Sequence, residues 1–162
     1  MYKENRLVHF MSVLRRRYDA RATILGSPDY PDIYGVLWLY QTNYGVIVAC
    51  EVTGLPYSKD KCKEHIFGLH IHEGMSCTGN DIDPFGDTLG HYNPYACQHP
   101  YHAGDLLPLF GAGGYAMSVF LTDRFDVNEV IGRAVIVHSS PDDFTTQPSG
   151  NSGKKIACGI IK

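Results

Sequence analysis

The feature that most constrains the fold is a succession of short runs rich in β-branched and aromatic residues. These runs cover residues 20–25, 33–40, 45–53, 66–73, 115–123, 131–138 and 155–161. Turn sequences rich in Gly, Pro, Asn and Asp separate them, as at residues 26–29 and 54–56, and such residues end strands. The pattern predicts seven or eight short strands, and therefore an all-β antiparallel sandwich or barrel.

Composition restricts the class of protein. The chain has 162 residues, which favours one domain. Its hydrophobic residues make up 44% and its charged residues 19%, as in a globular protein rather than a disordered one. The net charge of -3 lacks the basic field of a nucleic-acid-binding protein. No apolar run is long enough to span a bilayer, so we expect no nucleic-acid partner and no membrane partner.

The first 19 residues differ from the rest. We expect residues 1–19 to be an N-terminal extension and residues 20–162 to form the single β domain. Leu7, Phe10, Met11 and Leu14 have the spacing of a short helix. The apolar patch is short and the Arg triplet at residues 15–17 follows it, which is unlike a signal peptide. We therefore expect a cytoplasmic protein as the sequence is written, with a secreted or cell-envelope location left open.

Two segments interrupt the strand pattern, at residues 74–114 and 139–154. Both are rich in Gly, Pro and Asp, and neither has a sustained period. A structureless loop of this length is rare in a compact domain unless it is functional or disordered. Because the longer segment contains several His, Cys and Asp, metal coordination and a cross-link are two ways in which it can be held in place.

The histidines supply candidate ligands. His70 and His72 are two residues apart in a predicted strand, so their side chains share a face and can reach one metal ion; two unrelated, half-exposed histidines are the alternative. His91, His99, His102 and Asp105 offer three nitrogens and one oxygen, a set that suits zinc; the alternative is a solvated His-rich loop.

A bridging imidazole would complete two sites. His138 ends an apolar run and is a candidate partner for the first pair, with one more ligand from the loop cluster. Six His and one Asp supply one ligand fewer than two four-coordinate ions require. A single imidazole bound through both nitrogens closes this gap. The arithmetic leaves open which histidine bridges.

Together these residues resemble the copper/zinc superoxide dismutase family. The matching segments occur in the family's order, at residues 68–73, 91–94, 102–106, 131–133 with His138, 141–143, 150–153 and 157–159. Cys77, five residues after His72, is more similar to bacterial members than to the animal cytosolic form. The fold that the resemblance implies is an eight-stranded antiparallel Greek-key β-barrel with long metal-binding loops.

The resemblance also implies the ligand sets and their cofactors. Copper would be bound by His70, His72, His91 and His138. Zinc would be bound by His91, His99, His102 and Asp105, with His91 as the bridge. Asp142 would accept hydrogen bonds from ligand histidines of both sites and fix their tautomers. Cys77 and Cys158 would form the family's disulfide.

The implied activity is that of a superoxide dismutase. Copper would cycle between Cu(II) and Cu(I), converting the small anion superoxide to dioxygen and hydrogen peroxide, with His91 giving and taking a proton. The family has an Arg beside copper where this chain has Lys155; Lys keeps the charge but lacks the planar fork of donors. The family forms homodimers through different surfaces and also includes monomers, so the oligomeric state stays open.

Two other functions are consistent with the motifs. A relative that binds copper and zinc for buffering or delivery, with little or no turnover, is the main alternative. A zinc hydrolase is the other, but it needs an open zinc position, whereas this ligand cluster is closed. Three further cysteines, Cys50, Cys62 and Cys97, are expected to be buried, unreactive thiols.

Overall fold

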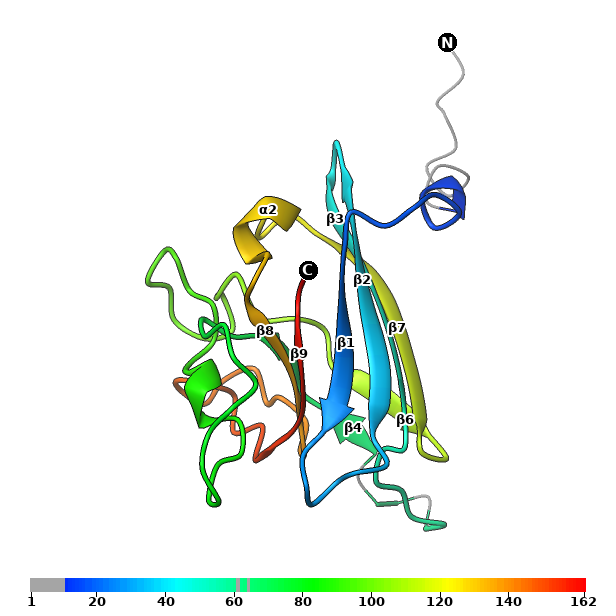
Figure 1. Ribbon diagram of the computed structural model, residues 1–162, viewed down its shortest axis with the longest axis vertical. Coiled ribbons are helices and arrows are strands. Elements are labelled where there is room, and N and C mark those ends of the chain that lie inside the picture. Colours follow the sequence, from blue (N-terminus) through cyan, green and yellow to red (C-terminus); the bar gives the residue numbers. More distant parts are fainter. Residues whose placement is uncertain (1–10, 61, 64) are drawn as a thin grey trace.

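The computed structural model describes residues 11–60, 62–63 and 65–162. Within them, one antiparallel sheet has the strand order β4-β6-β7-β3-β2-β1-β9-β8-β5 (Figure 1). The strands are β1 (Ala20–Gly26), β2 (Tyr34–Thr42), β3 (Gly45–Thr53), β4 (Ile66–Phe67), β5 (Leu69–Ile71), β6 (Leu109–Ala112), β7 (Tyr115–Thr122), β8 (Ala134–His138) and β9 (Lys155–Ile160).

The sheet is a nearly closed barrel because its two edges meet at one residue. β4 and β5 lie at opposite ends of the strand order, yet only Gly68 separates them in sequence. β4 pairs with β6 and β5 pairs with β8, so residues 66–71 close the barrel. The chain crosses the barrel between β3 and β4 and again between β7 and β8, which gives the expected Greek-key order.

Gly68 divides one of the seven predicted runs into two strands, and this division, together with β6, gives the nine strands of the sheet. The Gly68 amide donates to the carbonyl of Ser140 and its carbonyl accepts from the amide of His138, each at 2.8 Å. A Cβ at this position would lie 3.1 Å from the Ser152 hydroxyl oxygen and 3.3 Å from His138 Cβ. The close approach divides the predicted run at residues 66–73 into two strands, as glycine often does inside a strand.

Two further elements lie outside the predicted runs. β6 occupies part of the segment predicted to be a loop at residues 74–114, and Gly113 and Gly114, both with positive φ, turn it into β7. The short helix α2 (Val127–Val130) has a capping box between Asp126 and Glu129, a sequence signal that the strand pattern obscured. Because this turn intervenes, β8 begins at Ala134 rather than at Ile131.

The core fills the barrel. In β1 the buried residues Ala20, Ala22 and Ile24 alternate with exposed ones, as expected for a strand with one face inward. They belong to one apolar cluster contributed by all of the longer strands. In β8, by contrast, all five residues are buried, because loop residues cover the outer face of that strand, so alternation marks the inward face in β1 but not in β8.

A smaller cluster lies outside the barrel, where the chain before β1 packs on the sheet. Residues 11–13 are helical, and Val13 is buried against Tyr40, Ile47 and Ala49. Leu7 and Phe10 of the predicted helical stripe lie outside the described residues. Met11 is 50% exposed, so the predicted stripe is wrong at this position, because Val13 faces the sheet instead.

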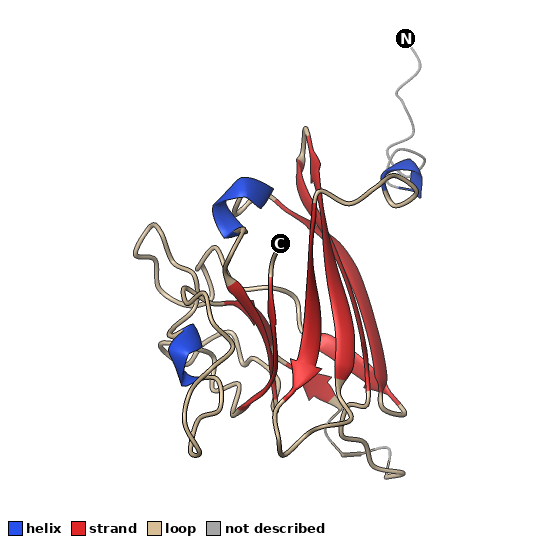
Figure 2. Ribbon diagram, in the orientation of Figure 1, coloured by secondary structure: helices blue, strands red, loops and turns tan. Residues whose placement is uncertain are grey.

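The two long loops gather on the side of the molecule beyond β8 and β9 (Figure 2). The predicted disulfide between Cys77 and Cys158 is confirmed and joins the first loop to β9. Beside it, Phe85 packs against Ala134, Ile136 and Cys158, just before the 3-10 turn η1 (Gly86–Thr88). These contacts hold the loop on the outer face of the barrel.

The remaining cysteines differ from one another. Cys50 is buried, and burial, followed by the charge of Glu51, raises the pKa of its thiol to about 12. Cys62 and Cys97 are exposed free thiols, so the expectation of burial is wrong for both, because they lie in polar loops. Among the helices of the described residues, none has the length and hydrophobicity needed to cross a membrane.

Candidate metal centre

Two groups of four potential ligands lie side by side in the loops. The first contains His70, His72, His91 and His138, and the second contains His91, His99, His102 and Asp105. Within each group the ligand atoms lie within 4.8 Å of one another, and every member is buried. His91 belongs to both groups, so all seven predicted ligand residues come together around one shared imidazole.

Barrel and loop contribute jointly to the first group. His70 lies in β5 and His72 follows it, so strand alternation directs both imidazoles to one side. His138 ends β8, where the pairing with β9 shifts register. Single β-bridges connect His72 to His91 and His70 to Asp105. These bridges fix the loop against β5 and bring residues distant in sequence into register.

Hydrogen bonds orient the nitrogens of the first group toward one point. His72 Nδ1 lies 2.9 Å from the Leu89 carbonyl, and His138 Nδ1 lies 3.4 Å from the Gly153 carbonyl. A carbonyl only accepts, so each Nδ1 carries the proton and each Nε2 presents a lone pair. The two Nε2 atoms are 3.3 Å apart. At this distance the lone pairs of the two Nε2 atoms repel each other unless a cation lies between them. A metal ion would accept both lone pairs, so the group fits a metal ion.

The second group also presents unprotonated nitrogens toward one point. His99 Nε2 donates to Asp142 Oδ1 at 2.9 Å, which leaves Nδ1 unprotonated. That Nδ1 lies 3.1 Å from Asp105 Oδ2, and His102 Nδ1 lies 3.3 Å from the same oxygen. Neither nitrogen has a hydrogen-bond partner in the described part of the chain. Buried acceptors that face one another without a donor are a ready-made cation site.

Burial favours the neutral imidazole at His70, His72 and His138, and the neutral imidazole is the form that binds metals. Burial lowers the pKa of His70, and together with the neighbouring histidines it places the pKa of His72 well below the usual value. For His138, burial and then the charges of His70 and His91 lower the pKa to about 3. At neutral pH, His70, His72 and His138 therefore need lose no proton before they bind a metal.

Asp142 connects the two groups. Its Oδ2 accepts from His70 Nε2 at 2.8 Å and its Oδ1 accepts from His99 Nε2 at 2.9 Å. Burial alone would raise the pKa of Asp142, but these bonds and one from the Phe144 amide hold it at about 2. The carboxylate is thus ionised, and it directs Nδ1 of one histidine into each group.

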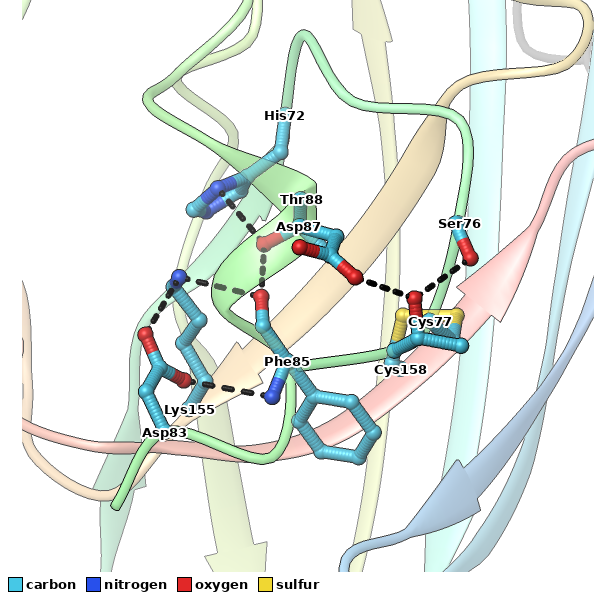
Figure 3. Close-up of a disulfide and its surroundings, with 10 residues drawn as sticks. His72, Ser76, Cys77, Asp83, Phe85, Asp87, Thr88, Lys155 and Cys158 are labelled. Carbon is cyan, nitrogen blue, oxygen red and sulfur yellow. Dashed lines mark hydrogen bonds and ion pairs between the residues drawn. A yellow bond between two sulfur atoms is a disulfide. The ribbon is translucent and has the colours of Figure 1, made fainter. Parts of the chain in front are cut away.

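Lys155 lies beside the first group, in register with His138 across the strand pair. Its Nζ is 3.0 Å from Asp83 Oδ2 and 3.1 Å from the Phe85 carbonyl. The same carbonyl accepts from the Thr88 hydroxyl at 2.7 Å, and that hydroxyl lies 3.5 Å from His72 Nδ1. Figure 3 shows this chain of contacts next to the disulfide.

Fold and site together define a metal-binding β-barrel protein with two adjacent sites that share one histidine. The sequence model of the family described as copper/zinc superoxide dismutase (SODC) matches residues 33–161. The chain therefore belongs to the copper/zinc superoxide dismutase family, as its motifs indicated. Copper and zinc are the cofactors of this family, and the two ligand groups correspond to them in number.

Named relatives are mostly bacterial enzymes. Superoxide dismutase [Cu-Zn] 2 of Aquifex aeolicus is 32% identical over 146 residues, which are 81% of this chain and 80% of the relative. The Legionella pneumophila enzyme is 32% identical over 152 residues, covering 89% of this chain and 87% of that enzyme. A solved superoxide-dismutase-like protein from Bacillus subtilis superposes with a TM-score of 0.70 at 25% identity, covering 89% of this chain and 99% of that one.

Sequence reasoning missed several residues of the site. The carbonyls of Leu89 and Gly153 orient two ligands, but a backbone acceptor has no side-chain signal. Asp83 contacts Lys155 from 72 positions away, and no spacing rule relates the two. Arg124 Nη1 donates to the carbonyls of Pro100, His102 and Asp105; an arginine after β7 gave no indication that it braces this loop.

Proposed function

We propose that the protein is a superoxide dismutase, which converts two superoxide anions and two protons to dioxygen and hydrogen peroxide. The observation that carries this proposal is the sharing of His91 by two buried four-ligand groups. The reaction requires a group that exchanges one electron and a source of protons; the first ligand group would hold the redox-active ion, and the second would hold an ion that keeps the loop in place. The relatives named as superoxide dismutases support the same activity.

The donor sets determine which metal each group would hold. His70, His72, His91 and His138 offer four imidazole nitrogens, a set that suits copper in both of its common oxidation states. His91, His99, His102 and Asp105 offer three nitrogens and a carboxylate, which suits tetrahedral zinc. When bound, copper supplies the one-electron exchange with the substrate.

The chain's own residues supply the remaining functions. His91 Nε2 is buried and has no hydrogen-bond partner among the described residues, and the opposite nitrogen contacts Asp105 Oδ1 at 2.7 Å. We assign to His91 the holding of a proton at Nε2 and its delivery to the reduced substrate. We assign to Lys155 the electrostatic attraction and positioning of the anion.

The variant Asp142→Ala tests whether the carboxylate that connects the two groups orients their histidines. In Asp142→Ala the Nε2–H groups of His70 and His99 lose their acceptor, so both rings are free to rotate. Loss of such a partner costs about 10–100-fold in metal affinity or activity, and we expect a loss of this size at both groups. Chelator-competition titration with copper and with zinc measures it.

The neighbouring carboxylate provides the control for Asp142. Asp143 bonds to Thr145 and Thr146 within its own turn, so Asp143→Ala leaves the ligand histidines unchanged. Unchanged affinities in Asp142→Ala, or equal losses in the two variants, would show that Asp142 does not orient the ligands.

Lys155→Arg tests the departure from the family. The planar guanidinium donates two parallel hydrogen bonds where an ammonium acts as a point charge. We expect azide, a small anion, to bind the copper- and zinc-loaded variant about twofold to threefold more tightly, since bidentate charge-assisted pairs are the stronger ones. Lys154→Arg is the matched control. Equal activity and equal azide affinity in Lys155→Arg and the parent would refute the idea.

Metal analysis combined with an activity assay tests the proposed function itself. We expect one copper and one zinc for each chain, with rapid dismutation when both are bound. Zinc binding alone, with no dismutation, would favour a role in metal buffering or delivery. This second candidate has support of its own, because one relative, YojM of Bacillus subtilis, carries the name superoxide dismutase-like protein.

A further inference from the structure

Lys155 is already engaged before any anion arrives. Its side chain is 16% exposed, and its ammonium lies 3.0 Å from the carboxylate of Asp83. An ammonium has three N–H donors, and in the described residues two of them face Asp83 and the Phe85 carbonyl. One donor remains for a further ligand, and the charge of the lysine is partly compensated.

A tight turn fixes the position of Asp83. Its amide donates to the Asn80 side chain at 3.0 Å, and its own Oδ1 accepts from the Phe85 amide at 3.2 Å. Its carbonyl accepts from the amides of Asn80 and Gly86, each at 3.0 Å. The carboxylate is therefore held opposite Lys155 by its own backbone surroundings rather than swinging freely in solvent.

Packing contacts and the disulfide also fix this tight turn to the barrel. Phe85 packs on Ile136 and Cys158, and the Cys77–Cys158 disulfide anchors the same loop to β9, in which Lys155 is the first residue. Figure 3 shows Asp83, Phe85 and Lys155 converging beside these anchors. The distance between the two charges is thus set by covalent and packing constraints.

The ion pair lies at an opening to solvent. A cavity of about 280 Å³ is lined by Lys154 and Lys155 and by three carboxylates, those of Asp29, Asp81 and Asp83. Negative charges therefore outnumber positive ones around its wall. A small anion that reaches Lys155 here has to share the ammonium with Asp83 and approach against this field.

We propose that Asp83 is a positioning residue that limits the availability of the Lys155 ammonium to small anions entering the metal site. The inference rests on the proposed function, since it adds a control on the anion contact of the same reaction. It predicts that the carboxylate weakens anion binding, and that removing its charge strengthens binding only when Lys155 is present.

The test compares Asp83→Asn with Asp81→Asn. Asparagine retains an oxygen that can accept from the Phe85 amide, so the turn is preserved while the charge is lost. Asp81 lines the same cavity and makes no side-chain hydrogen bond or ion pair in the described part of the chain, so its variant removes an equal charge without touching Lys155. The probe is azide, titrated into the copper- and zinc-loaded proteins by the visible spectrum of copper.

We expect azide to bind Asp83→Asn about threefold to fivefold more tightly at low ionic strength, the size of effect that a partly exposed ion pair supports. Asp81→Asn should differ from the parent by less than about twofold, because its charge is more remote and screened. The gain should shrink as salt is added. In a Lys155→Met background, Asp83→Asn should change azide affinity by no more than Asp81→Asn does in the parent.

A second readout needs no metal. In the metal-free protein, acetic anhydride should acetylate Lys155 faster in Asp83→Asn than in Asp81→Asn, as followed by peptide mass spectrometry, because the amine has lost its partner. Equal azide affinity in the two Asn variants, or a gain that persists without Lys155, would overturn the proposal. If azide behaves as expected but the loaded protein does not dismute superoxide, the proposed function fails and the role of Asp83 stands.

Discussion

His91→Ala should weaken both metal sites at once and abolish most of the activity. The imidazole is the one member common to the two ligand groups, so its removal takes a ligand from each. Loss of an outer-sphere partner alone costs about 10–100-fold, and loss of a direct ligand should cost at least about 100-fold in affinity at each site. Copper and zinc content after dialysis, chelator competition and a dismutation assay measure the effect.

Two single-site variants make the comparison sharp. His72→Ala removes a ligand from the first group alone, and His102→Ala removes one from the second alone. We expect each of these to weaken chiefly the binding of one metal, whereas His91→Ala weakens the binding of both. A His91→Ala protein that bound either metal with the parent's affinity would show that the imidazole is not shared.

Removal of the disulfide should produce the largest loss of stability. Cys77 and Cys158 are 81 positions apart, and the chain-entropy model gives a stabilisation of about 4–5 kcal/mol for a loop of that length. We expect Cys77→Ala/Cys158→Ala to lower Tm by about 10–15 °C, given about 2–4 °C per kcal/mol for a chain of this size. Thermal unfolding of the metal-free protein measures the effect, because bound metals would also stabilise the loop.

The chain offers its own control for this experiment. Cys62→Ala/Cys97→Ala removes the two exposed free thiols and leaves the cross-link intact, so its Tm should remain within about 1–2 °C of the parent. Similar Tm values for the two double variants would mean that the disulfide contributes little beyond the packing of Phe85 and its neighbours.

Much of the barrel could be predicted because strand formation depends on local pattern. The alternation in residues 20–25 and the turn signals around residues 54–56 specify which side chains face inward and where each strand ends. Two features were not predicted from the local pattern: the break between strands at Gly68 and the short helix that begins with the Asp126–Glu129 capping box. A β-rich run did not reveal that the chain bends away from the ladder to bond with Ser140 and His138.

The metal centre, like the barrel, could be predicted only in part from the sequence. The i, i+2 spacing of His70 and His72 is sufficient to place both imidazoles on one side of a strand, and the density of His and Asp at residues 91–105 indicated a second cluster. Which of these residues share an ion does not follow from spacing. That required the resemblance to a family and then the fold, because His138 and Asp142 reach the cluster only through the closed barrel.

By itself, the sequence determined the β-rich architecture, the residues able to bind metals and the family to which they belong. Only the tertiary structure decided the orientation of those ligands. The carbonyls of Leu89 and Gly153 and the carboxylate of Asp142 select the nitrogens that face each group, and Asp83 meets Lys155 across the barrel's outer surface. These contacts join segments distant along the chain, and only the packing of the core and the disulfide brings such segments to hydrogen-bonding distance.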